Sequence, residues 1–166
     1  VGECEKAGVK LGINFHNRFM PPFIEIRRII ASGEIGEVHL VQAEVSPGAR
    51  SGGRLATWRV DPALAGLGTT YSIGVHLYDI LRYLVASEVE MVSAFFDKPR
   101  GVMEEMNVSL FRFSNGVLAQ LSVHENSPLP HNDIVVYGAK GRITGRGITR
   151  SRDGGVLTVT TEDGRT

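Results

Sequence analysis

The sequence lacks the features that would place a protein outside the cell, in a membrane or on nucleic acid. Its single cysteine, Cys4, allows no internal disulfide, and no signal-peptide pattern is present, so a reducing compartment is favoured. No apolar run approaches the ~18 residues that a membrane-spanning helix needs. Eighteen basic residues balance eighteen acidic ones, which argues against broad capture of nucleic acid or anionic membranes. We therefore expect a cytoplasmic protein that binds neither.

The sequence also lacks the signature motifs of nucleotide and metal sites. Gly66 and Gly68 are not followed by the third glycine of a dinucleotide fingerprint, and Gly145-Arg146-Gly147 lies among predicted strands. There is no P-loop. No two of the five histidines have the helical spacing of metal ligands. The sequence thus predicts no metal site and contains no nucleotide-binding motif of its own.

Hydrophobic spacing predicts an α+β domain. Residues 1–7 have the pattern of a last helical turn that ends at Gly8, and residues 9–15 alternate as a strand does. Two longer helices are expected near 22–32, after a proline pair, and at 68–86. Strands are expected at residues 38–45, 89–96, 106–113, 117–125, 133–137 and 142–149. Turns such as Asn115-Gly116 favour hairpins, so we predict a large, open, mostly antiparallel sheet with helices on one face.

The other face of this sheet is also predicted to carry apolar side chains, which must be shielded from water. Apolar residues occur in both alternation phases of the predicted strands, at Val108, Leu110, Val117, Leu121, Val123, Val135 and Val136. A homo-oligomer formed through the sheet face is the expected solution, with a dimer and a tetramer both possible. The chain opens on Val1, inside a predicted helix, and closes at Thr166 just after a turn. We interpret it as a domain excised from a longer protein.

The densest group of chemically capable side chains lies in and after a glycine-broken loop. At about 100° per residue, Ser72, His76, Asp79 and Tyr83 share a wedge of roughly 60° beside an apolar stripe. Histidine transfers protons near neutral pH, so His76 is a candidate acid or base. The alternative is a structural histidine at the start of a helix, whose ring forms hydrogen bonds only with the backbone. A Ser–His–Asp hydrolase is disfavoured, because Ser72 and His76 one turn apart cannot easily reach an acyl group that faces an oxyanion hole.

Other candidate contacts precede this segment. Arg18 follows the first predicted strand, and strand ends commonly face clefts in α/β proteins, so it is a credible polar anchor. Trp58 and Arg59 lie in the long predicted loop 46–67, and loops of this length are usually functional or disordered. A tryptophan beside an arginine is typical of sugar or polyol contacts. A hydrophobic plug that holds the loop down is the alternative.

Four segments, in order, resemble the Gfo/Idh/MocA oxidoreductases (glucose-fructose oxidoreductase, inositol dehydrogenase and relatives). They are residues 14–21, residues 30–38, the stretch from Trp58 to Gly68, and the Gly-Val-His-Leu-Tyr-Asp run at 74–79. The resemblance implies a two-domain enzyme, in which a Rossmann domain binds NAD or NADP and an α+β domain supplies the substrate site and the oligomer interface.

The resemblance also implies how this chain divides. Residues 1–16 would be the last helix and strand of the Rossmann domain. Residues 17–166 would be the C-terminal substrate-binding and oligomerisation domain, truncated at its end. The family's cofactor fingerprint and its Glu-Lys-Pro motif would precede Val1, so the cofactor-binding residues are unknown and the isolated chain is expected to be inactive.

His76 matches the catalytic histidine of the family, which takes the proton of a substrate hydroxyl as hydride leaves the same carbon for the nicotinamide. Family members often carry an aspartate four residues earlier. Here that position is Ser72, which supplies no charge, and Tyr71 or Asp79 could compensate. We expect substrate contacts from Arg18, Trp58, Arg59, Tyr71 and Ser72. The resemblance therefore implies an oxidoreductase acting on a sugar, polyol or related hydroxy compound. The alternative, motivated by Ser72, is a non-catalytic relative that senses a ligand or cofactor and regulates a partner.

Overall fold

A seven-stranded sheet forms the centre of the computed structural model, which describes residues 1–48, 61–66, 68–98, 103–125, 127–149 and 155–164. The strand order is β2-β3-β4-β1-β5-β6-β7. Every neighbouring pair is antiparallel except β1 and β4, which run parallel. The strands are β1 (Val38–Ser46), β2 (Val89–Phe96), β3 (Met106–Phe113), β4 (Leu118–His124), β5 (His131–Gly138), β6 (Gly141–Arg146) and β7 (Val156–Thr161). The predicted α+β class and mostly antiparallel open sheet are confirmed.

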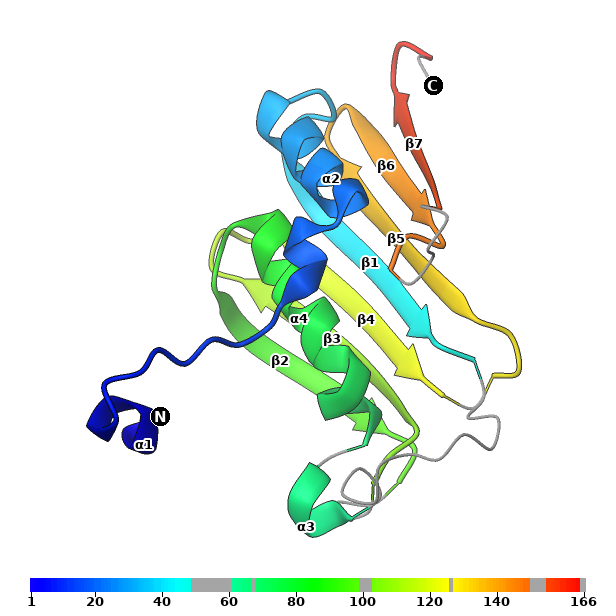
Figure 1. Cartoon of the computed structure of the whole chain (residues 1–166). Helices are drawn as coiled ribbons and strands as arrows, with labels where there is room; N and C mark the ends of the chain where they lie inside the picture. Colours follow the sequence, from blue (N-terminus) through cyan, green and yellow to red (C-terminus); the bar gives the residue numbers. More distant parts are fainter. Residues whose placement is uncertain (49–60, 67, 99–102, 126, 150–154, 165–166) are drawn as a thin grey trace.

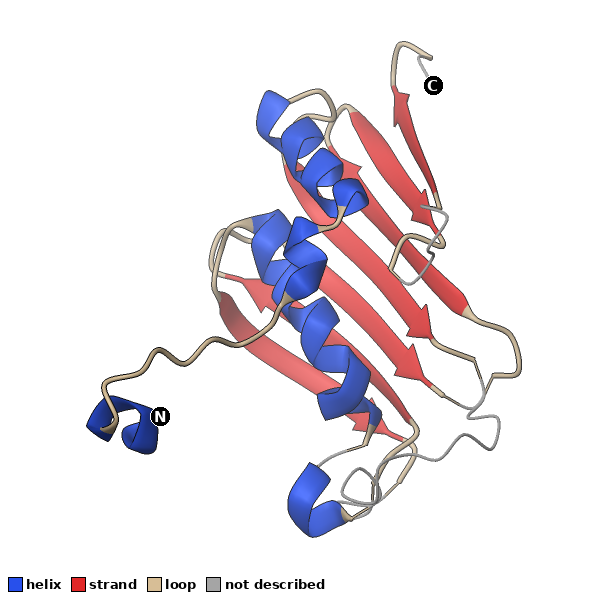
Figure 2. Ribbon diagram, in the orientation of Figure 1, coloured by secondary structure: helices blue, strands red, loops and turns tan. Residues whose placement is uncertain are grey.

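Two helices, α2 (Pro21–Ser32) and α4 (Val75–Val85), cover one face of the sheet (Figures 1 and 2). Proline occupies the first turn of α2, where the missing N–H is not needed, and Gly33 ends the helix in the left-handed region at φ 74°. The start and end signals in the sequence therefore predicted this helix correctly. No helix among the described residues is long and apolar enough to cross a membrane.

The core lies between these helices and the strand residues that point toward them. Phe23, Ile26 and Ile29 of α2, with Leu77, Ile80 and Leu84 of α4, are at most 2% exposed. They pack in one cluster with residues of the sheet, among them Val41, Phe113, Leu121 and Val136. Full burial of one such side chain contributes roughly 1.5–3 kcal/mol, so this single layer anchors α4, the helix that bears His76.

The N-terminal segment departs from the prediction. Helix α1 (Gly2–Lys6) is followed by Gly8, as expected, but residues 9–15 form no strand. Val9, Leu11 and Ile13 are exposed, and Figure 1 shows the segment running away from the sheet. A strand needs a neighbour for its N–H and C=O groups, and none of the described residues provides one. Alternation therefore does not produce a strand here, because the described residues offer no pairing partner.

Two further elements were not predicted. The described part of the long loop 46–67 contains a short helix, α3 (Pro62–Ala65), whose first turn is capped by Asp61 Oδ1 accepting from Ala63 N at 2.9 Å. At the other end of the chain, β7 pairs with β6 along the sheet edge. The sequence contains Asp153-Gly154-Gly155 before β7 and Asp163-Gly164 after it, which are typical of chain reversals, but no strand was predicted between them.

Candidate active site beside His76

The segment that carries His76 does not begin as a regular α-helix. Residues Thr70–Gly74 form a π-helical turn, and α4 begins only at Val75. A π turn holds more residues than an α turn and is frequent at functional sites. It changes the helical phase, so a calculation at 100° per residue does not hold across this junction. Ser72 and His76 line one pocket across this junction. Asp79, which follows His76 within regular α4, does not line that pocket and contacts Arg18 instead.

Glu104 holds the start of this segment in place. Its two carboxylate oxygens accept hydrogen bonds from the backbone N–H groups of Gly68, at 2.7 Å, and Thr70, at 2.8 Å. Its own carbonyl oxygen accepts from Thr69 N at 3.1 Å. A Cβ at Gly68 would lie only 1.9 Å from that carbonyl oxygen, so the contact requires glycine. An acidic side chain from the loop before β3 thus caps the turn that leads into the His76 helix.

The surroundings of Glu104 also set its charge. Burial by itself would raise the pKa of this carboxyl, but hydrogen bonds from the side chain and backbone of Thr70 and from the Gly68 N–H outweigh it. The pKa therefore lies below its ordinary value, and the clamp is anionic near neutral pH. A second set of bonds continues from Thr70, whose Oγ1 accepts from Asn107 Nδ2 at 2.8 Å.

A pocket of about 150 Å³ opens beside His76. It is lined by His16, Asn17, Val45, Ser72, Ile73, His76, Leu77 and Thr149. The His16 ring meets the His76 ring nearly edge to face, with 5.1 Å between ring centroids. Phe15 approaches the same imidazole at 6.4 Å. The pocket therefore brings together two imidazoles, one amide and two hydroxyl groups, which can bind a polar ligand and exchange a proton with it.

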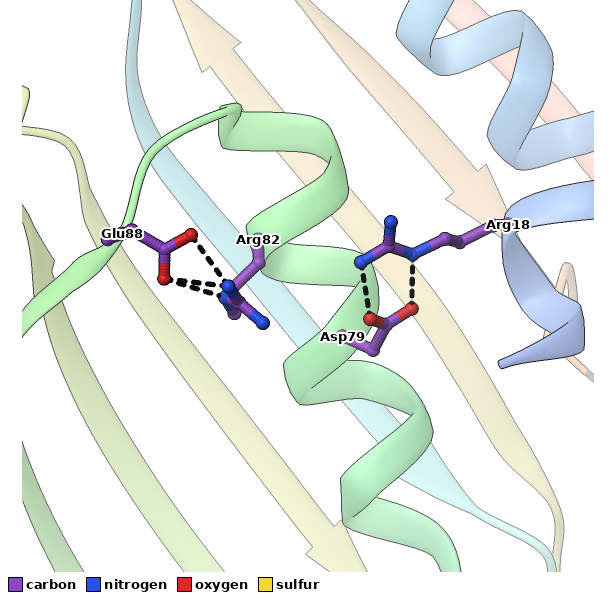
Figure 3. A network of polar contacts seen from close by, with 4 residues as sticks. All are labelled: Arg18, Asp79, Arg82 and Glu88. Carbon is purple, nitrogen blue, oxygen red and sulfur yellow. Dashed lines mark hydrogen bonds and ion pairs between the residues drawn. The ribbon is translucent and has the colours of Figure 1, made fainter. Parts of the chain in front are cut away.

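Arg18 lies away from this pocket and forms an ion pair with Asp79 (Figure 3). Its Nε donates to Oδ2 at 2.7 Å and its Nη2 donates to Oδ1, so both oxygens of the buried carboxylate are engaged. The hydrogen bond to Asp79 raises the pKa of Arg18 despite its partial burial. This pair ties the 3₁₀ turn His16–Phe19 to α4. Both oxygens of Asp79 are thus bound to Arg18, and Asp79 does not line the pocket beside His76.

The predicted site residues are thus only partly brought together. His76 and Ser72 share the pocket, whereas Arg18 and Tyr71, which is 60% exposed, do not line it. Trp58 and Arg59 lie outside the described residues. Sequence reasoning missed His16, Asn17 and Thr149, although the first two stand directly before Arg18 in a segment that had been singled out. Among the described residues, no three histidine, cysteine or acidic side chains are placed to bind a metal ion.

Known proteins match most of this chain. The family profile described as the GFO/IDH/MocA C-terminal domain matches residues 23–144. The 1,5-anhydro-D-fructose reductase of Ensifer adhaerens is 27% identical over 164 residues, which cover 97% of this chain and 49% of the reductase. The myo-inositol 2-dehydrogenase of Thermotoga maritima is 26% identical over 150 residues, 86% of this chain and 43% of the dehydrogenase.

A solved structure matches almost the whole chain as well. The aldose-aldose oxidoreductase from Caulobacter crescentus, crystallised with glycerol, has a TM-score of 0.82 and 27% identity. The match covers 96% of this chain and 48% of the oxidoreductase. This chain therefore spans about half the length of the proteins it matches.

Proposed function

This chain belongs to the GFO/IDH/MocA oxidoreductase family, whose C-terminal domain it matches, and we propose that it forms the substrate side of an oxidoreductase active site. The substrate is a sugar, a polyol or a related hydroxy compound. Two relatives support this class, one named a reductase of an anhydro sugar and the other a dehydrogenase of inositol. The observation that carries the proposal is the pocket in which His76 faces hydroxyl and amide groups.

His76 would act as the acid or base. In oxidation its imidazole takes the proton from the substrate hydroxyl while a hydride leaves the same carbon, which becomes a carbonyl, and in reduction the imidazole returns the proton. A bound NAD or NADP would supply the hydride acceptor or donor. The sequence contains no Gly-x-Gly-x-x-Gly fingerprint, so the residues of this chain would orient the substrate and hold its proton rather than grip the dinucleotide.

The test uses the protein encoded by the complete gene, with NAD⁺ and NADP⁺ and a panel of sugars and polyols. We expect His76→Ala to lower kcat by about 10²–10⁴-fold, the usual contribution of a general acid or base. His39→Ala removes an exposed histidine at the start of β1, outside the pocket, and should leave kcat unchanged. Unaltered kcat in the His76 variant would exclude this role. We also expect the isolated chain to show no turnover.

A second candidate function follows from Ser72, which stands where the family resemblance leads us to expect an aspartate. In this alternative the protein is a non-catalytic relative that senses a ligand or cofactor and regulates a partner. The same panel separates the two functions. Protein that binds NAD(P) but oxidises and reduces nothing would favour the sensor, whereas turnover that depends on His76 would eliminate it.

The division and assembly of the chain are also part of the proposal. Residues 1–16 would belong to the preceding cofactor domain, because residues 9–15 have no strand partner among the described residues. Protease cleavage within 9–15 should then leave the remainder folded, and loss of its cooperative unfolding would contradict the boundary. The uncovered sheet face would form a homo-oligomer.

The single cysteine fits a cytoplasmic location, which a fluorescent fusion would check.

A further inference from the structure

Asn17 is an unusual member of the pocket beside His76. Its side chain is 4% exposed, yet its amide oxygen has no hydrogen-bond partner among the described residues. More than nine in ten buried polar groups in native proteins have a partner, and a buried acceptor without one carries a free-energy cost. Because Asn17 lines the pocket, a ligand that enters it could supply the missing donor.

The position of Asn17 is held on both sides. Its carbonyl oxygen accepts from Met20 N at 3.1 Å, which closes the turn that leads into α2. The next residue, Arg18, is bound to the buried Asp79 of α4. The backbone of this turn therefore cannot swing the amide out to solvent without breaking an ion pair. A binding group held in place before the ligand arrives loses little entropy on binding.

The other polar groups of the pocket are imidazoles and hydroxyl groups, all of which form hydrogen bonds. The exposed ring of His16 stands 5.1 Å from that of His76, and Thr149 Oγ1 donates to Asn132 Oδ1, which leaves the Thr149 oxygen able to accept. No lysine, arginine or carboxylate lines the pocket among the described residues. This composition suits a neutral polyhydroxy ligand better than a phosphate or a carboxylate, which bind most strongly to arginine and lysine. The volume equals roughly five water molecules, enough for a small polyol or part of a sugar ring.

We propose that Asn17, assisted by His16, binds a second hydroxyl of the substrate whose reacting hydroxyl is at His76. Asn17 is then a specificity-determining residue: it selects neutral substrates that carry at least two hydroxyls and rejects analogues that lack the second. This assignment rests on the proposed oxidoreductase function. Asn17 takes no part in moving the proton or the hydride. Its loss should therefore weaken substrate binding more than it slows turnover.

The experiment compares Asn17→Ala with Asn14→Ala in the protein from the complete gene. Asn14 is exposed, lies in the same segment and does not line the pocket. With the best substrate of the panel and its mono-deoxy analogues, we expect Asn17→Ala to raise KM about tenfold or more with kcat within threefold. We also expect it to lose the preference for the full substrate over one deoxy analogue. A variant with wild-type KM and wild-type preference would overturn the proposal.

Two further measurements test the subsite if the alanine variant does not fold or if the wild type shows no turnover. Asn17→Asp keeps the shape and one accepting oxygen, so it replaces the alanine variant should that variant not fold, and it should retain part of the preference. If the wild type turns over nothing, the proposed function fails, and thermal shifts with glycerol and inositol then test the subsite alone. A shift in wild type and Asn14→Ala that Asn17→Ala loses supports the subsite. Equal shifts in all three, or none in any, overturn it.

Discussion

Glu104 shows how one side chain outside the pocket controls the groups within it. It satisfies two backbone N–H groups at the turn where the His76 segment begins, and its side chain is almost completely buried. Without it, these donors would have no partner, and the π turn that places Ser72 and His76 on one pocket would lose its anchor. The carboxylate is therefore expected to matter for both stability and activity.

The lowered pKa of Glu104 leads to a pH prediction. A carboxyl group with a pKa lower in the folded than in the unfolded state contributes stability that is fully present above the unfolded value, and loses it as pH falls through the folded value. Glu104→Gln should lower the free energy of unfolding by about 1–3 kcal/mol at pH 7. The difference from wild type should shrink below pH ~4.5.

Urea unfolding between pH 7 and pH 3 measures this dependence. Glu105→Gln is the matched control, because Glu105 is exposed and its ion pair among the described residues is with Lys98. An exposed pair of this kind contributes ~1 kcal/mol or less to stability. A difference between wild type and Glu104→Gln that stays constant down to pH 3 would contradict the linkage.

Ser72 is the residue at which the site departs from its resemblance to the family. Ser72→Asp places a carboxylate in the pocket beside His76, and a nearby negative charge favours a protonated imidazole. We expect the acid limb of the pH profile of kcat/KM to move to higher pH in this variant. If the wild type is inactive, we expect turnover to appear. Ser114→Asp, in the exposed β3–β4 turn, is the control, and identical profiles for both variants would show that position 72 does not act on His76.

At the scale of elements, one ion pair connects the turn before α2 to the middle of α4. Asp79 is 5% exposed, and its partner Arg18 approaches from 61 positions away in the sequence. The same guanidinium stacks over the Tyr83 ring at 5.5 Å. Figure 3 shows that a second pair, Arg82 with Glu88, lies nearby but joins only the end of α4 to the start of β2.

Arg18→Ala should destabilise the domain by about 2–3 kcal/mol, because it leaves a buried carboxylate without its cation. Arg18 is itself partly exposed, so the expected loss in the free energy of unfolding is smaller than for a fully buried pair. Arg28→Ala, which removes an exposed pair with Glu25 three residues away, should cost ~0.5 kcal/mol or less. A double-mutant cycle with Asp79→Ala measures the coupling, and additive losses would show that the pair contributes nothing of its own.

At the scale of the whole molecule, the described helices α2 and α4 cover one face of the sheet, and none of the described residues covers the other. The uncovered face exposes large apolar side chains near the β2 edge, among them Phe95 at 77%, Leu110 at 52% and Leu118 at 51%. Apolar patches of this kind commonly mark interaction surfaces. A second copy related by a two-fold axis would cover each patch with its own equivalent.

Leu110→Arg should therefore convert the proposed oligomer to a monomer, because a charge within the patch would be buried without a partner. Light scattering after size exclusion gives the mass. Leu129→Arg is the control, since Leu129 is 73% exposed and lies between β4 and β5. A wild type that is already monomeric at micromolar concentration, or equal masses for all three proteins, would rule out the sheet-face assembly.

Elements with local signals were predictable from the sequence alone. Prolines at the start and a glycine at the end delimit α2, and the Asn115-Gly116 turn sets the β3–β4 hairpin, because caps and turns act within a few residues. The alternation of the strands and the spacing of the helices then determined the fold class. The resemblance of several short motifs pointed to His76, whose position on a pocket the structure describes.

Tertiary structure decided everything that depends on partners far apart in the chain. Residues 9–15 alternate like a strand but have no pairing partner in the described part of the chain. The π turn occurs where Glu104 binds the N–H groups of Gly68 and Thr70. Helical spacing placed Asp79 on the same face as His76, but in the structure Arg18 donates hydrogen bonds to both oxygens of Asp79. Sequence by itself determined the two long helices, most of the strands and, through the family resemblance, the candidate histidine. Only packing decided which side chains share its pocket, because periodicity does not encode contacts between elements.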